Sequence, residues 1–133
     1  MEEWSRWEPI KGVSGKFFVD VLTMTEDGLL IKLSNWKNSD KIEIAFNGLI
    51  DAYRYTNDSF CFKIPSELSK RYPDDFYSNW TFFKVTHSDY LKWLSEKSAT
   101  WSNEFDFVHF CIIGGDEIVD ILARYEPDVK IIT

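Results

Sequence analysis

Apolar and polar side chains alternate in short runs along the first half of the chain, a pattern that predicts β-strands. Two such runs, residues 17–24 and 29–33, flank Glu26-Asp27-Gly28. Asp-Gly between two apolar runs is typical of a β-hairpin. Residues 41–46 alternate isoleucine and phenylalanine with polar or small residues, which predicts a third strand with one face toward solvent.

The same reasoning extends the strands to about residue 64. Asn47-Gly48 follows the third run, and this dipeptide predicts a second hairpin whose returning strand covers residues 49–56. One more strand is expected over 59–64, after the polar Asn57-Asp58 pair. Residues 13–64 therefore predict an antiparallel meander of four or five strands.

The second half of the chain mixes helical and strand patterns. A short helix is expected to begin at Pro65 and to end before Pro73. A strand is expected over residues 80–85. Ser88 or Asp89 then suits the N-cap of a helix that reaches about residue 98, because its apolar residues recur at helical spacing.

The last third contains the longest apolar run of the chain. Residues 105–113 are almost continuously apolar, which predicts a central strand covered on both faces. Gly114-Gly115 turns the chain, and residues 116–125 carry apolar side chains at i, i+3, i+4 and i+7, the spacing of an amphipathic helix with Asp120 on its outer side. A last strand is expected over 129–132.

Together these elements predict a single α+β domain over residues 1–133. It would hold an N-terminal β-meander (13–64) and a C-terminal αβαβ part (65–133), since no linker, repeat or charge block divides the chain. The expected architecture is a largely antiparallel sheet of five to seven strands, with two or three helices packed mainly on one face.

Composition narrows the function classes. The chain is 44% hydrophobic and holds 11 Phe, 6 Trp and 6 Tyr, which excludes a disordered segment. Its net charge of −7 is unfavourable for binding a nucleic-acid backbone, so no nucleic-acid partner is expected. No apolar run is long enough to span a membrane, and the N-terminus is acidic where a signal peptide is basic. We therefore expect a cytoplasmic protein without a membrane partner.

Candidate chemistry is sparse. Cys61 and Cys111 lie in apolar contexts that are typical of buried free thiols in a reducing compartment. His109 lies two residues before Cys111, so both point to one face of a strand and form a formal Cys–His pair. A core histidine beside a core thiol is the simpler interpretation. The remaining sequence lacks a phosphate-binding loop and the ligand spacing of a zinc site. No catalytic residue, cofactor or metal is expected.

Acidic and aromatic side chains are the remaining candidates for a binding surface. Residues 67–133 carry 12 acidic against 7 basic side chains, which favours either a solubilising surface or an acidic patch for a basic protein partner. Exposed tryptophans are frequent interface hot spots. The candidate partner-binding residues are Asp74, Asp75, Trp101, Asp116, Glu117, Asp120 and Glu126, with Asp128 beside them.

A resemblance to a protein group extends over residues 76–130. Its motifs are the stretch from Trp80 to Leu94, the strand from Phe107 to Ile113 that contains a histidine, the Asp-Ile-Leu at 120–122, and a closing Glu126-Pro127. This layout resembles small immunity-like proteins of polymorphic toxin systems in Gram-positive bacteria. The resemblance implies a cytoplasmic protein that binds and blocks a toxin domain and performs no chemistry of its own.

The leading hypothesis is therefore a non-catalytic immunity protein for a cognate toxin domain, with a nuclease as the concrete version because nucleases carry cationic clefts. Two alternatives stay open. One is a regulator that binds a small ligand or peptide in an aromatic pocket. The other is a hydrolase built on Cys111 and His109.

Overall fold

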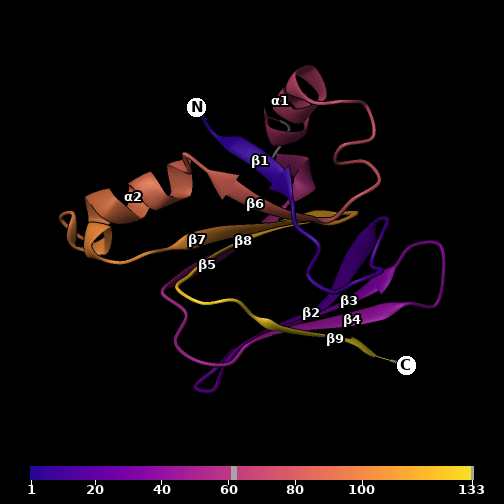
Figure 1. Ribbon diagram of the computed structural model, residues 1–133, viewed down its shortest axis with the longest axis horizontal. Helices are drawn as coiled ribbons and strands as arrows, with labels where there is room; N and C mark the ends of the chain where they lie inside the picture. The colour runs from indigo at the N-terminus through magenta and orange to yellow at the C-terminus, as the bar shows by residue number, and fades with distance from the viewer. Residues whose placement is uncertain (61–62, 133) are drawn as a thin grey trace.

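The computed structural model describes residues 1–60 and 63–132, and over this part the chain forms two antiparallel sheets that pack face to face (Figure 1). The five-stranded sheet has the order β1 (Glu3–Arg6), β6 (Phe82–Thr86), β7 (Val108–Ile113), β8 (Glu117–Ala123), β5 (Ala52–Asn57). The four-stranded sheet has the order β2 (Phe17–Thr25), β3 (Gly28–Asn35), β4 (Lys41–Phe46), β9 (Asp128–Ile132).

The mixed α+β class is confirmed, but the described residues form nine strands in two sheets instead of five to seven in one. Both helices, α1 (Lys63–Arg71) and α2 (Asp89–Lys97), lie on the side of the five-stranded sheet that faces away from the four-stranded sheet (Figure 1). Two short 3-10 turns complete the fold, η1 (Asp58–Phe60) and η2 (Trp101–Glu104).

The β2–β3 hairpin forms where Asp27-Gly28 predicted it. Gly28 has a φ of 130°, and a Cβ at this position would lie 1.9 Å from the carbonyl oxygen of Phe46. Only glycine fits here, since the turn needs a positive φ and the next strand passes against its backbone. The tight turn brings β3 between β2 and β4.

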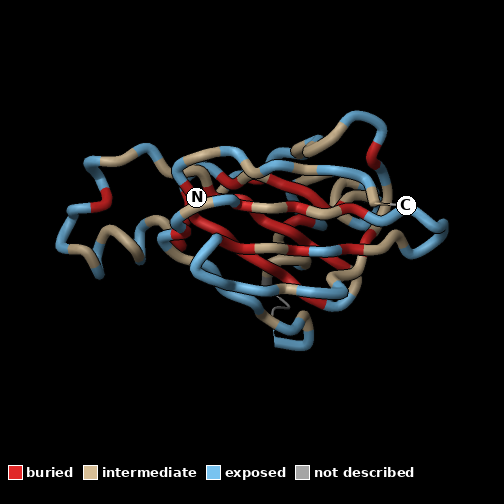
Figure 2. Tube along the Cα trace, turned by 90° about the horizontal axis from the view of Figure 1, so that it is seen from below, coloured by how far each residue is buried: buried red, intermediate tan, exposed pale blue. Residues whose placement is uncertain are grey.

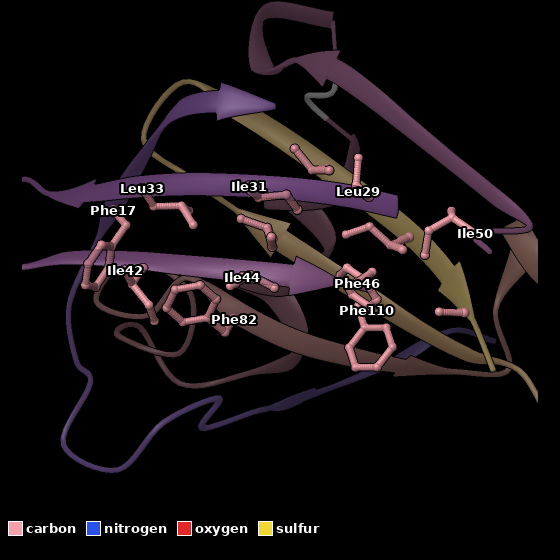
Figure 3. Close-up of a cluster of buried hydrophobic side chains, with 14 of the residues drawn as sticks. Phe17, Leu29, Ile31, Leu33, Ile42, Ile44, Phe46, Ile50, Phe82 and Phe110 are labelled. Carbon is pink, nitrogen blue, oxygen red and sulfur yellow. The ribbon is translucent and has the colours of Figure 1, made fainter. Parts of the chain in front are cut away.

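The main hydrophobic core fills the space between the two sheets. Alternate residues of every central strand point into it, and Figure 3 shows the aromatic and aliphatic side chains from both sheets meeting there. Buried positions concentrate along these strands and exposed positions along the loops (Figure 2). The four-stranded sheet contributes Phe17, Leu29, Ile31, Leu33, Ile42, Ile44 and Phe46, and the five-stranded sheet contributes Phe82, Phe110, Ile112, Val119, Ile121 and Ala123.

A second apolar cluster lies on the opposite face of the five-stranded sheet, under α1. Leu68 of α1 is fully buried there against Trp4 and Phe83. The strands β6, β7 and β8 therefore carry apolar side chains on both faces, as predicted for the run 105–113. The outer layer of helices depends on this second cluster.

The predicted hairpin at Asn47-Gly48 is wrong. Strand β4 pairs with β3 on one edge and with β9 on the other, so the chain after Phe46 finds no free edge of the four-stranded sheet. It crosses instead to the five-stranded sheet, where β5 pairs with β8. Ile50, which is buried in the main core, anchors this crossing.

The predicted helix over residues 116–125 is also wrong, because Glu117–Ala123 is strand β8. Its apolar spacing fits a helix, but it fits equally a strand buried on both faces. All seven residues of β8 are buried, and Gly114-Gly115 serves as the turn of a β7–β8 hairpin. Tertiary burial on two sides therefore selects the strand.

Three smaller differences complete the comparison. The strand expected over 59–64 is wrong, since η1 occupies Asp58–Phe60 and α1 begins at Lys63, while Cys61 lies outside the described residues. Strand β1 was not expected from the sequence. The two predicted parts also interleave, because β9 joins the sheet of β2–β4 and β5 joins the sheet of β6–β8.

Candidate functional site

A group of polar side chains lies on the outer face of the five-stranded sheet, beneath α2; Ser88, His109 and Asp120 are buried there, and Arg54 at the edge strand is about half exposed. We call Arg54, Ser88, His109 and Asp120 the polar cluster. His109 lies on β7, Asp120 on β8 and Arg54 on β5, and the strand register pairs Arg54 directly with Asp120. Ser88 is the N-cap of α2, as its position before the helix predicted. Three strands and one helix start therefore meet at this cluster.

Hydrogen bonds join the four side chains in one chain. Asp120 accepts from His109 Nε2 at 2.6 Å and from Arg54 Nε at 2.9 Å. His109 Nδ1 lies 2.7 Å from Ser88 Oγ, which also accepts the backbone N–H of Leu91 at 3.0 Å. The two ring nitrogens of His109 are therefore each engaged, Nε2 with the Asp120 carboxylate and Nδ1 with the Ser88 hydroxyl. Every member therefore has a partner.

The charges of Asp120 and Arg54 stabilise each other within the cluster. Burial by itself raises the pKa of the Asp120 carboxyl, but the hydrogen bond and charge of His109 and the charge of Arg54 outweigh burial and lower this pKa below its usual value. Burial likewise lowers the pKa of Arg54, yet the Asp120 carboxylate overcomes this effect and raises it. The Arg54 guanidinium also lies 4.1 Å from the centre of the Tyr90 ring, which covers His109. The cluster thus contains an ion pair between Arg54 and Asp120, and the Tyr90 ring packs against Arg54 and His109.

Cys111 lies beside this cluster on β7, on the face that the sequence predicted for a Cys–His pair. Its register partner across the sheet is Asp120, and both ring nitrogens of His109 are bonded to other residues. Burial raises the pKa of the Cys111 thiol well above its usual value, and the nearby Asp120 carboxylate raises it further. The thiol is therefore held in the protonated form, which is the unreactive form.

Ser88, His109 and Asp120 also have the composition of a hydrolytic triad. In such a triad the serine oxygen is exposed to substrate. Here Ser88 is buried and its oxygen already caps α2, so it is not exposed to a substrate. The geometry suits a structural network that fixes α2 on the sheet.

A metal ion is the other chemistry that this group could support, because ligand atoms of His109, Cys111 and Asp120 lie within 4.8 Å of one another. Two atoms that bind one zinc ion lie roughly 3.3 Å apart, given metal–ligand distances of about 2.0 Å. His109 Nε2 and Asp120 Oδ1 are 2.6 Å apart and share a proton, and Arg54 holds the other carboxylate oxygen. The residues as arranged do not fit a metal.

The structure divides the candidate partner-binding residues into buried and exposed ones. Asp120 is 3% exposed and Glu117 is 4% exposed, and the Glu117 carboxylate accepts the backbone N–H of Val19. The expected helix would have placed Asp120 on its outer side, whereas both residues lie in the buried strand β8. Neither side chain is free to contact a partner in this fold. The remaining candidates, Asp74, Asp75, Trp101, Asp116 and Glu126, are exposed.

These exposed candidates lie at two opposite ends of the five-stranded sheet. Asp116 lies in the β7–β8 turn, and Asp74 and Asp75 lie in the loop that leads into β6 at the same end. Trp101 precedes β7 and Glu126 follows β8 at the other end, where Val108 pairs with Ala123. Glu126 also forms a surface ion pair with Lys84 at 2.5 Å. No single patch contains all five.

The end that carries Trp101 exposes aromatic side chains beside surface hollows. Trp101 is 65% exposed and Trp93 of α2 is 45% exposed. Behind Trp101, Phe105 and Phe107 line two adjoining surface hollows of about 210 and about 290 Å³. We call the segment 101–107 together with Trp93 the η2 surface. It projects beyond the sheets with α2 (Figure 1).

The backbone just before Trp101 is strained. Ala99 and Thr100 have positive φ angles of 51° and 68°, which non-glycine residues rarely adopt, and a β-branched residue least of all. The turn is held by backbone hydrogen bonds from Thr100 to Ser95 and from Trp101 to Ser98. Such strain costs of order 1 kcal/mol or more per residue and is frequent at functional surfaces.

Sequence reasoning missed Arg54 and the hydrogen-bonding role of Ser88. Ser88 was expected as a helix cap, and His109 as a core residue. No local signal connects Arg54 to Asp120, because they are 66 positions apart and meet only through the β5–β8 pairing.

Comparisons with protein-family models, with curated proteins and with solved structures found no match to this chain. The resemblance to immunity-like proteins therefore remains a prediction. Over the described residues, neither helix is long and apolar enough to cross a membrane.

Proposed function

We propose that this protein is a non-catalytic binding module that neutralises a cognate toxin domain, and that it docks through the η2 surface. The observation that carries the proposal is the exposure of Trp101 on a strained, hydrogen-bonded turn beside two hollows. Large rigid aromatic side chains in such positions are typical hot spots of protein interfaces.

Charge supports a basic partner. Glu104 and Asp106 are exposed on the η2 surface, and the whole chain carries a net charge of −7. A toxin that cleaves nucleic acid has a cationic cleft, and an acidic inhibitor gains association rate and specificity against it. A nuclease domain is therefore the proposed target class.

The state of the buried groups supports a role without chemistry. The Cys111 thiol is kept protonated by burial, and the buried side chains of the polar cluster, Ser88, His109 and Asp120, are hydrogen-bonded to one another. A binding module needs only a stable scaffold beneath its interface, and the cluster fixes α2, which leads into the η2 surface.

The test is a calorimetric titration with the C-terminal domain of a large secreted protein encoded beside this one. We expect tight one-to-one binding that weakens with added salt. Trp101→Ala should weaken it by about 30-fold or more, the loss typical of a hot spot. The charge reversals Glu104→Lys and Asp106→Lys, made together, should slow association.

Two matched control variants test which end of the five-stranded sheet carries the docking surface. Phe60→Ala removes an aromatic side chain that is 84% exposed in η1, at the opposite end, and should leave affinity unchanged. Asp74→Lys with Asp75→Lys reverses two exposed charges at that same opposite end. If this pair abolishes binding while Trp101→Ala does not, the docking surface is assigned to the wrong end. Absence of binding to the toxin domain at micromolar concentration would reject the proposed function.

A further inference from the structure

A surface pocket of about 390 Å³ opens at the end of the sandwich opposite the η2 surface. Its walls come from the start of β2, the β3–β4 loop, the loop before β6 and the β7–β8 turn. We call it the Lys16 pocket, after the lysine that lines it together with Phe18, Trp36, Lys37, Asn79 and Gly115. Its size lies at the lower end of the range for small-molecule sites.

The aromatic wall of this pocket is held in place by backbone contacts. The Phe18 and Trp36 rings lie 6.1 Å apart with an interplanar angle of 32°. Phe18 packs directly on Gly115, where a Cβ would come within 2.1 Å of its ring. The backbone N–H of Trp36 donates to the carbonyl oxygen of Lys16 at 3.0 Å. The Phe18 ring is thus fixed against the β7–β8 turn, and the Trp36 ring beside it is open to solvent on one side.

Lys16 supplies a cation that has no anionic partner among the described residues. Its Nζ donates to the carbonyl oxygens of Tyr77 at 2.7 Å and of Trp80 at 3.0 Å. An ammonium group has three donors, so one remains. Over residues 1–60 and 63–132, no carboxylate lies within ion-pair distance of it. Burial lowers the pKa of Lys16 to about 8, which expresses the cost of holding this charge unpaired.

Most lysines of the described residues lack a carboxylate partner, but those others are exposed to solvent, whereas Lys16 is partly buried. The more exposed Lys84 and Lys130 both have carboxylate partners, Glu126 and Glu43. The Glu117 carboxylate influences Lys16 from a distance but accepts its hydrogen bond from Val19 instead. The group that would complete Lys16 is therefore an anion from outside the chain, and the exposed Lys37 adds a second positive charge to the same pocket.

We propose that the Lys16 pocket binds a small planar organic anion, an aromatic carboxylate of one ring, with its ring on Phe18 and Trp36 and its carboxylate on the Lys16 ammonium. The ligand class follows from a flat aromatic wall next to an unpaired cation. The volume accommodates one ring with short substituents. This site is separate from the η2 surface, so ligand binding in the Lys16 pocket can be tested independently of the proposed toxin partner.

Benzoate is the simplest probe, and benzamide is its neutral counterpart of the same shape. Titration of ¹⁵N-labelled protein, followed by amide chemical shifts, should give saturable shifts at Gly115 and Trp36 with benzoate, with a Kd on the order of 1 mM. Benzamide should bind roughly tenfold more weakly, because a charge-assisted hydrogen bond is lost. Benzoate binding should also fade as the pH rises through about 8 and above, because the Lys16 ammonium loses its proton there.

Two pocket variants and one control sharpen the test. Lys16→Met keeps the apolar stem and should reduce benzoate affinity roughly tenfold, to the level of benzamide. Trp36→Leu changes an exposed side chain, so it leaves folding intact and still removes the stacking surface. Lys97→Gln, which removes an exposed lysine at the end of α2 far from this pocket, should change nothing.

Three results would overturn the inference. They are equal binding of benzoate and benzamide, unchanged benzoate affinity in both Lys16→Met and Trp36→Leu, and absence of any saturable shift near the pocket. Should Lys16→Met fail to fold, Trp36→Leu and the benzamide comparison still decide the question.

Discussion

Strands β7 and β8 present two faces that are equally buried but built from different chemistry. The face toward the four-stranded sheet carries Phe110, Ile112, Val119 and Ile121, all 1% exposed or less. The face toward the helices carries the polar His109 and Asp120, 3% exposed or less, among the apolar Cys111, Ile113, Ile118 and Leu122. Successive residues of a strand alternate between the two faces, so one hairpin serves both.

The difference lies in what each face demands of its neighbours. The apolar face gains stability from the area removed from water, which any side chain of similar size and shape can supply. The polar face gains only if each donor and acceptor finds its partner, because an unpaired buried charge is costly. Arg54 and Ser88 are therefore as necessary to this face as the residues on the hairpin itself.

The largest effect is expected on the apolar face. Phe110→Ala removes a ring that packs between Trp7 and Phe46, with centroid distances of 5.0 and 5.3 Å. The lost contacts and the remaining cavity should lower the free energy of unfolding by roughly 3–5 kcal/mol. Urea denaturation followed by tryptophan fluorescence measures this value. Phe60→Ala, at an exposed position, should change it little, and a small effect of Phe110→Ala would show that the two sheets do not depend on this contact.

Asp120→Asn should have the next largest effect, because it leaves Arg54 and His109 without the carboxylate that pairs them. Removing one partner of a buried pair costs about 3 kcal/mol. The midpoint of urea unfolding should fall accordingly. Asp116→Asn, a matched change at an exposed position of the preceding turn, should stay within about 0.5 kcal/mol of the wild type. Equal stability of the two variants would mean that the polar face contributes nothing.

The acid limb of the stability curve tests the charge of this same carboxyl. The pKa of Asp120 is lowered in the folded state, so its ionised form stabilises the fold at every pH above the unfolded value of about 4. This contribution is lost as the pH falls below about 4 toward the folded pKa. The difference in unfolding free energy between wild type and Asp120→Asn should therefore shrink as the pH falls from about 5 to about 2.

Other carboxyls do not obscure this measurement. Burial raises the pKa values of Glu2 and Glu117, which gives their titration the opposite effect on stability. Both residues are present in wild type and variant, and the Asp120 charge is the smallest of the causes that shift the pKa of Glu2, so their contributions largely cancel in the difference. If the difference in unfolding free energy between wild type and Asp120→Asn stays constant with pH, the charge of Asp120 does not stabilise the fold.

Ser88→Ala should have the smallest effect of the series. It removes the N-cap of α2 and the partner of His109 Nδ1, which together cost about 1–2 kcal/mol. Hydrogen exchange of the Leu91 amide should increase more than that of Phe110, because the change loosens α2 and leaves the core intact. Ser95→Ala, on the same helix away from the cap, provides the control.

Local pattern determined much of this protein. Strands β2, β3, β4, β6, β7 and β9 lie where alternation or continuous apolar runs predicted them, and the turn at Gly28 and the cap at Ser88 follow from side-chain chemistry alone. These features depend on neighbours within a few positions, and that information is present in any short stretch of sequence.

Long-range pairing decided the rest. Residues 117–123 have an apolar spacing that suits helix and strand alike, and only burial between two layers selects the strand. The local sequence likewise does not determine which strand pairs with the second edge of β4. In the structure β9 pairs there, and β5 pairs with β8 in the other sheet. The polar cluster and the Lys16 pocket each join side chains from segments far apart in the chain. They exist only because strand pairing brings those segments together, and no local pattern encodes a meeting of distant residues.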